Sequence, residues 1–225
     1  MQTFVVRVWL PDRPGALGQV ASRIGAVRGD VVGIEILERG AGRAIDELVV
    51  QLPDADLVSL LLAEIDQVDG VDVEDVRPAP GELQDPRLDA LETAALLVGA
   101  SCEGDLLAAL VAHARRDFGA EWSVVVDLDE RALLASDGLP PPPGWLVAFV
   151  EGSQSSAAVS SGECGPDDVA WAALAGSRLA LLLGRQGRPF RARERYQLGA
   201  LARIAQHVLA GLHAHRSAPV PAGGL

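Results

Sequence analysis

The chain has 225 residues, 49% of them hydrophobic and 22% charged, a composition typical of a globular protein rather than a disordered one. Its formal net charge is −12, with acidic side chains in excess in both halves, which excludes the basic face that nucleic-acid binding requires. No apolar run reaches the roughly 20 residues that span a bilayer, and no leader pattern opens the chain. The sequence therefore predicts a cytoplasmic protein with neither nucleic acid nor membrane as a partner.

The sequence contains no lysine and no asparagine, whereas Ala, Gly, Arg and Pro are abundant. This bias is typical of a GC-rich bacterial genome, such as an actinobacterial one. The two cysteines, Cys102 and Cys164, are too few for a disulfide framework. The length allows two domains of ordinary size.

The first 80 residues predict four strands and two helices. The strands show β-branched or alternating apolar residues and are expected over 3–9, 30–37, 44–52 and 71–76. One helix is expected over about 16–28, and residues 53–56 open another that buries Leu57, Leu60, Leu61 and Ile65. The order βαββαβ predicts a ferredoxin-like sandwich of one sheet and two helices.

The turn between the first strand and the first helix reads Leu10-Pro11-Asp12-Arg13-Pro14-Gly15-Ala16-Leu17-Gly18. Pro14 suits a helix entry because it lacks an amide proton and has a preset φ. Gly15 removes the Cβ that would block a ligand or a neighbouring chain. Asp12 is placed to cap the helix or to accept a hydrogen bond from a cation. The free amides that follow form a small anion site, although such a turn on its own is more often only a capped surface turn.

This turn, the βαββαβ order and the strand Gly-Asp-Val-Val-Gly-Ile-Glu-Ile at 29–36 together resemble an ACT domain over about residues 2–78. The resemblance implies a regulatory module that binds an amino acid at a dimer interface. The ligand would lie between the first turn of one copy and the start of the second strand of a neighbouring copy. Carried over to this chain, the ligand-binding residues are Asp12, Arg13, Pro14, Gly15, Ala16, Leu17, Asp30, Val31 and Val32.

Asp30 departs from the family pattern, because ligand-binding members often have Asn just before the second strand. An amide donates to a carboxylate, whereas an ionised Asp repels one. Two interpretations stay open: Asp30 binds an ammonium or amide group while the turn amides hold the carboxylate, or the site has lost its ligand. A third explanation for the Asp at position 30 is random drift in a chain that contains no Asn. The unpaired edge of the sheet favours a homodimer formed by edge or helix contact.

Proline, glycine and polar residues over 77–86 predict a domain boundary. We expect an ACT-like domain over 1–79, a linker over 80–86, a second domain over 87–216 and a flexible tail over 217–225.

The second domain begins with two predicted helices, whose apolar stripes are Leu88, Leu91, Ala95, Val98 and Leu106, Leu107, Leu110, Val111, Ala114. Strands are expected over 121–128, 131–136, 169–174 and 177–185, and a long helix over about 191–214. The apolar run 145–150 is short for a core helix, so we favour a buried strand there. This arrangement predicts an α+β domain with a central antiparallel sheet.

Residues 184–205 are similar to the last strand, turn and helix of GAF domains, and the resemblance as a whole spans about residues 87–213. It implies a sensory and dimerising module, in some members with a small molecule in a pocket over the sheet. The cyclic-nucleotide signature and the cysteines of the methionine-sulfoxide-reducing members are not evident, so we expect an empty or very small pocket.

No residue pattern indicates catalysis, because no nucleophile has a positioned base. His207 and His213 lack metal-ligand spacing, so we expect no metal and no cofactor. The arginines Arg185, Arg188, Arg191, Arg193 and Arg195 indicate a solvated turn paired with Glu194 or other acids, or a site for a phosphate or an acidic partner. Two hypotheses follow: a non-enzymatic, amino-acid-sensing regulatory protein, or a ligand-free scaffold for dimerisation and docking of a protein partner.

Overall fold

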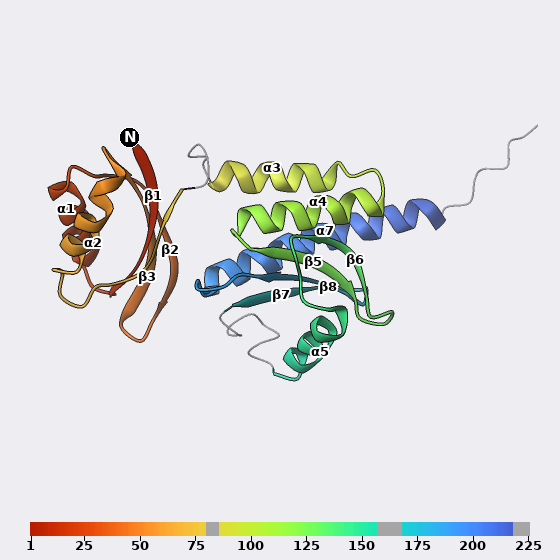
Figure 1. Ribbon diagram of the computed structural model, residues 1–225. Helices are drawn as coiled ribbons and strands as arrows, with labels where there is room; N and C mark the ends of the chain where they lie inside the picture. Colours follow the sequence, from red (N-terminus) through yellow and green to blue (C-terminus); the bar gives the residue numbers. More distant parts are fainter. Residues whose placement is uncertain (80–85, 157–167, 218–225) are drawn as a thin grey trace, which may run out of the picture. The chain divides into compact units, whose positions relative to one another are not determined.

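The computed structural model describes residues 1–79, 86–156 and 168–217, and the chain divides into two compact units, 1–84 and 85–225 (Figure 1). The predicted linker and tail lie outside the described residues, apart from their end residues Pro86 and Ser217, which belong to helices. No helix in the described ranges is both long enough and apolar enough to cross a membrane.

The N-terminal unit has the predicted βαββαβ order. Its elements are β1 Gln2–Pro11, α1 Ala16–Ala26, β2 Asp30–Gly40, β3 Arg43–Leu52, the 3-10 turn η1 Ala55–Leu57, α2 Val58–Ile65 and β4 Asp72–Pro78. The strands form one antiparallel sheet in the order β2-β3-β1-β4, and both helices cover the same face of it (Figure 1). This order leaves β2 and β4 at the edges.

The core of this unit follows from the period of two along the strands. Phe4, Val6, Val8 and Leu10 of β1 face the helices, which add Val20, Ile24, Leu61 and Ile65. The prediction for the second helix is wrong at Leu60, which is 49% exposed. Leu61 and Ile65 are one helical turn apart and define the buried side, and Leu60 lies about 100° away from Leu61.

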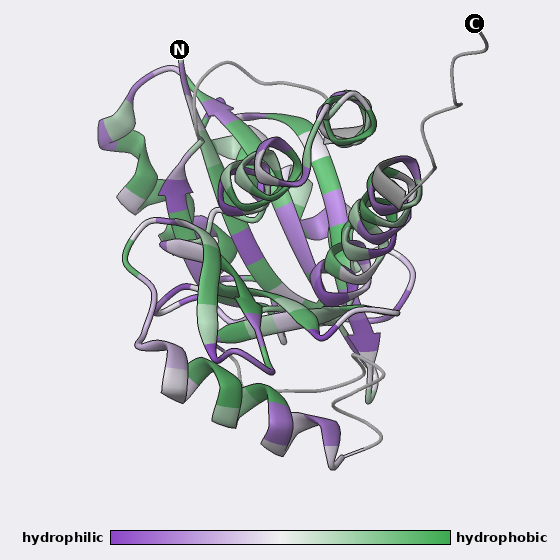
Figure 2. Cartoon of the chain, turned by 90° about the vertical axis from the view of Figure 1, so that its right-hand side faces the viewer, coloured by the Kyte–Doolittle hydropathy of each residue, from purple (hydrophilic) through white to green (hydrophobic). Residues whose placement is uncertain are grey.

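The C-terminal unit is α+β, as predicted. Its elements are α3 Pro86–Val98, α4 Glu103–Asp117, β5 Trp122–Asp127, β6 Ala132–Asp137, α5 Pro143–Gln154, β7 Val169–Leu174, β8 Leu179–Gly184 and α7 Ala192–Ser217. The strands form an antiparallel sheet in the order β6-β5-β8-β7. Helices α3, α4 and α7 lie on one side of the sheet and α5 lies on the other (Figures 1 and 2).

Both faces of this sheet are therefore buried, and two apolar clusters result. Val125, Leu181 and Leu183 belong to the cluster under α4 and α7, whereas Val124 and Leu182 belong to the cluster with α5. Because every side chain of β8 meets a covered face, the strand is buried along its whole length.

Two predictions for this unit are wrong. Residues 145–150 form part of α5 rather than a strand, since a proline in the first helical turn opens a helix that continues beyond the apolar run to Gln154. The stripe on α3 faces outward: Leu88, Leu91 and Val98 are 52%, 68% and 66% exposed, and Leu97 and Thr93 are buried instead. Thr93 donates to Asp117 of α4 at 2.8 Å, so a polar contact fixes the inward side of α3.

Candidate functional site

The turn between β1 and α1 is held by its own backbone. Asp12 N donates to Gly42 O at 2.9 Å, and Arg13 N donates to Pro11 O at 2.8 Å. Gly15 adopts a left-handed conformation, with φ of 88°, directly before α1. A Cβ at this position would meet no atom within 4 Å, so the backbone conformation rather than crowding favours glycine within one chain.

Two details of this turn differ from the sequence analysis. Gly15, not Pro14, directly precedes α1, and Pro14 lies in the exposed turn. Asp12 does not cap the helix, because no side chain caps α1. A capping side chain must stand at the residue just before the helix, where this chain has a glycine.

The start of α1 carries free amide groups. Ala16 N donates to Arg13 O at 3.3 Å, and Gln19 N donates to Gly15 O at 3.0 Å. Between them, the amides of Leu17 and Gly18 have no acceptor among the described residues. They lie at the positive end of the helix dipole, which favours an anion such as a carboxylate.

The second group of predicted site residues forms the start of β2. Asp30 pairs with Gln51 of β3 and is exposed. Val31 packs against the N-terminal core, and Val32 is 43% exposed at an irregularity in the register. The side chain of Asp30 has no hydrogen-bond partner in the part of the chain that the structure describes.

Within one copy, these two groups lie at opposite ends of the sheet. Asp30 pairs with Gln51, at the end where β1 begins. Pro11 and Gly40 both pair with Arg43, at the end that carries the β1–α1 turn. The strand between Arg43 and Gln51 spans about 27 Å. One chain alone therefore does not bring the predicted site residues together.

Asp46 of β3 is a residue that the sequence analysis missed. It lies between Ala44 and Leu48 in the row that faces the helices, and it is only 3% exposed. Its Oδ1 accepts no hydrogen bond from any described residue. Burial raises the pKa of this carboxyl, the Arg39 guanidinium opposes the rise, and the Asp12 carboxylate adds to it. The sequence signal that could have identified Asp46 is a single acid in an alternating row that is otherwise apolar, as at Ala44 and Leu48.

The sheet face opposite the helices carries an ion-pair network centred on Arg7, which is 1% exposed. Its Nε and Nη2 donate to Glu47 Oε1 at 2.9 and 2.8 Å, and Arg77 Nη2 donates to the same oxygen at 2.8 Å. Burial opposes ionisation of Glu47, but Arg7 and Arg77 outweigh it and lower the pKa of that carboxyl. Because each charged group in this network is paired with one of opposite sign, we interpret the network as structural.

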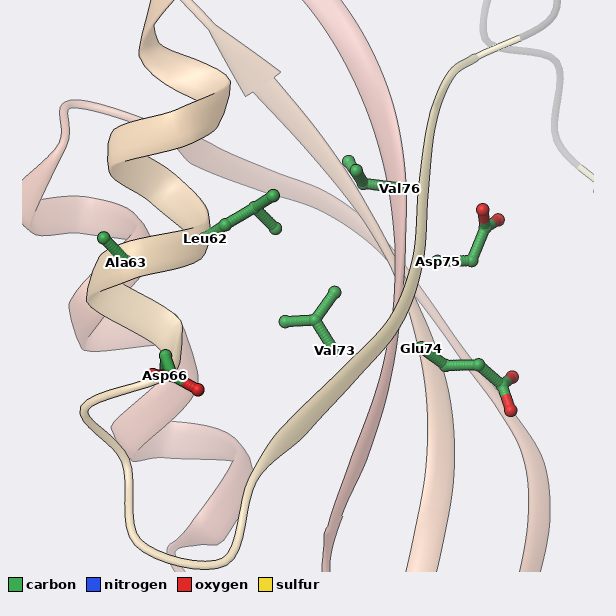
Figure 3. A pocket seen from close by; sticks show the side chains of 7 residues that line it. All are labelled: Leu62, Ala63, Asp66, Val73, Glu74, Asp75 and Val76. Atoms are coloured by element: carbon green, nitrogen blue, oxygen red, sulfur yellow. The ribbon is translucent and has the colours of Figure 1, made fainter.

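A hollow of about 490 Å³ lies between α2 and β4, and no residue of the β1–α1 turn lines it (Figure 3). It is lined by Leu62, Ala63, Asp66, Val73, Glu74, Asp75 and Val76. Figure 3 shows Glu74 and Asp75 pointing away from α2, and Asp75 pairs with Arg77 at 2.6 Å. Because its polar groups do not converge, this hollow is not a candidate site.

In the C-terminal unit, the place of the implied pocket is occupied by apolar packing between the sheet and α5, with Trp122 and Trp171 at its margin. The arginine cluster is partly internal, because Arg185 is buried and paired with Glu194. Cys102 is an exposed free cysteine, and Cys164 lies outside the described residues. No group of three potential metal ligands gathers within the described residues.

No protein-family model and no curated protein gave a significant match to the sequence. Among solved structures, the chain is similar to the ACT domain of a GTP pyrophosphokinase from Chlorobium tepidum, with 18% identity over 35% of this chain and 97% of that one and a TM-score of 0.29. It is similar to the GAF domain of a phosphoenolpyruvate-protein phosphotransferase from Acinetobacter, with 18% identity over 61% and 99% and a TM-score of 0.43.

An unknown protein from Galdieria sulphuraria is 15% identical over 92% of each chain, with a TM-score of 0.33. At these identities the likeness is one of fold. The solved structures to which the chain is similar thus include an ACT domain and a GAF domain.

Proposed function

We propose that this chain is a non-enzymatic regulatory protein that senses an amino acid, bound between the ACT-like units of two copies. The observation that carries the proposal is the separation of the two halves of the site by about 27 Å of strand. A single amino acid is too small to contact both halves within one copy, so a site built from both requires a second chain.

A second copy joined along β2 supplies the missing half. β2 is an edge strand, and it exposes Val32 and Ile34 by 43% and 51%. If two β2 strands pair antiparallel, Asp30 of one copy lies beside Gly40 of the other, at the same end of the sheet as the β1–α1 turn of that copy. A two-fold dimer then forms two equivalent sites.

The chemistry of the two halves suits a zwitterion. The free amides of Leu17 and Gly18 favour the carboxylate of the ligand, and the exposed carboxylates of Asp12 and Asp30 attract its ammonium group. Ammonium recognition is therefore the role that we propose for Asp30. Binding would favour one packing of the dimer, because a ligand shifts an equilibrium only through different affinities for its two states.

Thermal-shift measurements against the twenty amino acids test the proposal. We expect a concentration-dependent rise of Tm with one or a few of them. Gly15→Asp places a carboxylate at the anion site and abolishes the rise. Gly176→Asp is the matched control, because Gly176 also has a positive φ, 79°, and open space at its Cβ. No rise at millimolar amino acid, with a folded dimer verified by sedimentation, contradicts amino-acid sensing.

The second candidate is a ligand-free scaffold for dimerisation and protein docking. The outward apolar stripe of α3 favours it, since Leu88, Leu91 and Val98 are all more than half exposed. The same thermal-shift experiment separates the two candidates, because a scaffold dimerises without responding to any amino acid.

A further inference from the structure

The edge strand β4 has one open side. In the sheet order β2-β3-β1-β4 it pairs with β1, and no other strand of the described residues lies beside it. Ala79 N donates to Thr3 O at 2.8 Å, and this bonded pair sets the alternation of the ladder between the two strands. By that alternation, the backbone groups of Arg77 and Asp75 bond to β1, whereas the N–H and C=O of Val76 point to the open side. β4 therefore offers a donor and an acceptor to an added strand.

The hollow between α2 and β4 lies beside this open edge (Figure 3). Leu62 of α2 points toward β4, and Val73 and Val76 of β4 point toward α2, so the side chains that meet there are apolar. A small ligand needs converging polar groups, which this hollow lacks. An added strand instead makes its polar contacts through its own backbone and needs space for alternate side chains. The hollow gives that space on the helix side of the sheet.

The other face of this edge is acidic. Glu74 and Asp75 point away from α2 (Figure 3), and the side chain of Asp72 at the start of β4 is 69% exposed. Against these three acids, β4 carries one arginine, Arg77. A second copy added at this edge would place the acids opposite their own counterparts, which repel each other. A strand with basic side chains on this face complements the acids, so the edge favours a different protein over a second copy.

We propose that the groove between β4 and α2 binds an extended segment of another protein as a fifth, antiparallel strand, with apolar side chains toward α2 and basic ones on the opposite face. The residue opposite Val76 exchanges two main-chain hydrogen bonds with it, and its side chain points toward α2 as that of Val76 does. Its neighbours along the strand point to the face that carries Glu74 and Asp75. This contact is independent of amino-acid sensing, because the dimer proposed above uses the other edge, β2.

Calorimetric titration of the full chain with short peptides tests the strand pairing. The probe is a blocked peptide of alternating Val and Arg, used in about 0.3 M salt because the net charge of −12 attracts any cation. Its valines carry the N–H groups that face β4, so N-methylation of the valines removes these hydrogen bonds and N-methylation of the arginines does not. We expect the Kd to rise at least about tenfold for the valine-methylated peptide and to stay unchanged for the arginine-methylated one. A peptide of alternating Val and Glu should not bind.

A pair of variants tests the place of binding. Leu62→Arg puts a bulky cation into the groove, and we expect it to raise the Kd of the Val-Arg peptide at least about tenfold. Leu60→Arg is the matched control, because Leu60 belongs to the same helix, is 49% exposed and does not line the hollow. It should bind the peptide as the wild type does. Circular dichroism verifies that both variants are folded.

Each other outcome overturns the proposal. Failure of the Val-Arg peptide to bind the wild type does so directly. Equal effects of methylation at the valines and at the arginines would show attraction by charge without strand pairing. Equal affinities of Leu62→Arg and Leu60→Arg would place the peptide elsewhere on the protein. A shift from dimer to monomer in Leu62→Arg, measured by sedimentation, would show that a second copy covers this edge. Amino-acid sensing is decided in every case by its own thermal-shift experiment.

Discussion

Arg185, which follows β8, and Glu194, in the first turn of α7, form a buried ion pair with two hydrogen bonds. Arg185 Nη2 donates to both carboxylate oxygens of Glu194, at 2.7 and 2.9 Å, and the two residues are 3% and 8% exposed. The same guanidinium donates to Phe118 O at 2.6 Å and lies 3.9 Å from the centre of the Phe190 ring. Glu194 also accepts a hydrogen bond from Arg191 N at 2.9 Å, and this bond fixes the residue just before α7 to the first turn of the helix.

Removing one partner of this pair leaves the other charge buried. We expect Glu194→Ala to lower the free energy of unfolding by about 3 kcal/mol or more, measured by urea denaturation. The matched control is Asp129→Ala, which breaks an exposed pair with Arg178 in the same unit and leaves the urea midpoint almost unchanged. Equal effects of the two substitutions would contradict a structural role for the buried pair.

For Asp46 in the N-terminal unit we expect the opposite effect: removing its charge stabilises the fold. Burial raises the pKa of its carboxyl, so the folded protein holds a proton there more tightly than the unfolded chain does. The ionised form therefore destabilises the fold at neutral pH, and the penalty disappears as the pH falls through the raised pKa toward 3.8. We expect Asp46→Asn to be more stable than the ligand-free wild type at pH 7, by roughly 1 kcal/mol.

Urea unfolding of both proteins between pH 7 and pH 4 checks this prediction. The stability difference should shrink as the pH falls, because protonation neutralises the wild-type carboxyl. A difference that grows toward low pH would show that Asp46 is stabilised as an anion by groups other than Arg39 and would contradict the stated cause.

The sequence predicted the N-terminal unit well because the alternation of apolar residues along its strands has a single structural interpretation. Each strand of its sheet has one face toward the helices, so apolar side chains alternate visibly, as in Phe4, Val6, Val8 and Leu10. The failures in the C-terminal unit have a physical cause as well. The apolar run 145–150 fits a buried strand and a buried helix equally, and only the proline in the first turn of α5 distinguishes them.

The exposed stripe on α3 and the buried Asp46 show the limit of pattern reading. Leu88, Leu91 and Val98 have perfect helical spacing, yet the inward side of α3 is fixed by Thr93 and Leu97. The separation of the two halves of the candidate site was equally hidden, because it depends on the pairing of Arg43 and Gln51 with both neighbouring strands. Register across a sheet is a tertiary property that single-sequence spacing does not encode.

The network around Arg7 gives a pH prediction of the opposite sign. Arg7 and Arg77 lower the pKa of Glu47 despite its burial, so the ionised carboxylate stabilises the fold. That contribution is complete above pH 4.5 and is lost as the pH falls through the lowered pKa. We expect Glu47→Gln to lower the free energy of unfolding by about 3 kcal/mol at pH 7, because it leaves Arg7 buried without the charge of its hydrogen-bonded partner Glu47.

The double variant Arg7→Met with Glu47→Leu is the control for this effect. It replaces the pair by apolar side chains of similar volume and should recover much of the lost stability. The difference in stability between wild type and Glu47→Gln should be smaller at pH 3.5 than at pH 7, because below pH 4.5 the unfolded chain takes up a proton that the folded carboxylate resists. A constant difference at both pH values would mean that packing, not charge, sets the effect of the substitution.

The edge strand β2 supplies the last prediction, which joins assembly to ligand binding. Ile34 is 51% exposed on this edge, so Ile34→Glu leaves the fold of one copy intact. In a β2–β2 dimer with Asp30 beside Gly40, the two introduced carboxylates are diagonal neighbours near the two-fold axis and repel each other. We expect sedimentation to show a shift from dimer to monomer and calorimetry to show loss of amino-acid binding, since each site needs two chains. Leu91→Glu, on the 68% exposed position of α3, is the comparison. If the ligand site lies between β2 edges, Leu91→Glu binds the amino acid normally; if Leu91→Glu abolishes binding and Ile34→Glu does not, the two-chain site is built by α3 and the β2 pairing is wrong.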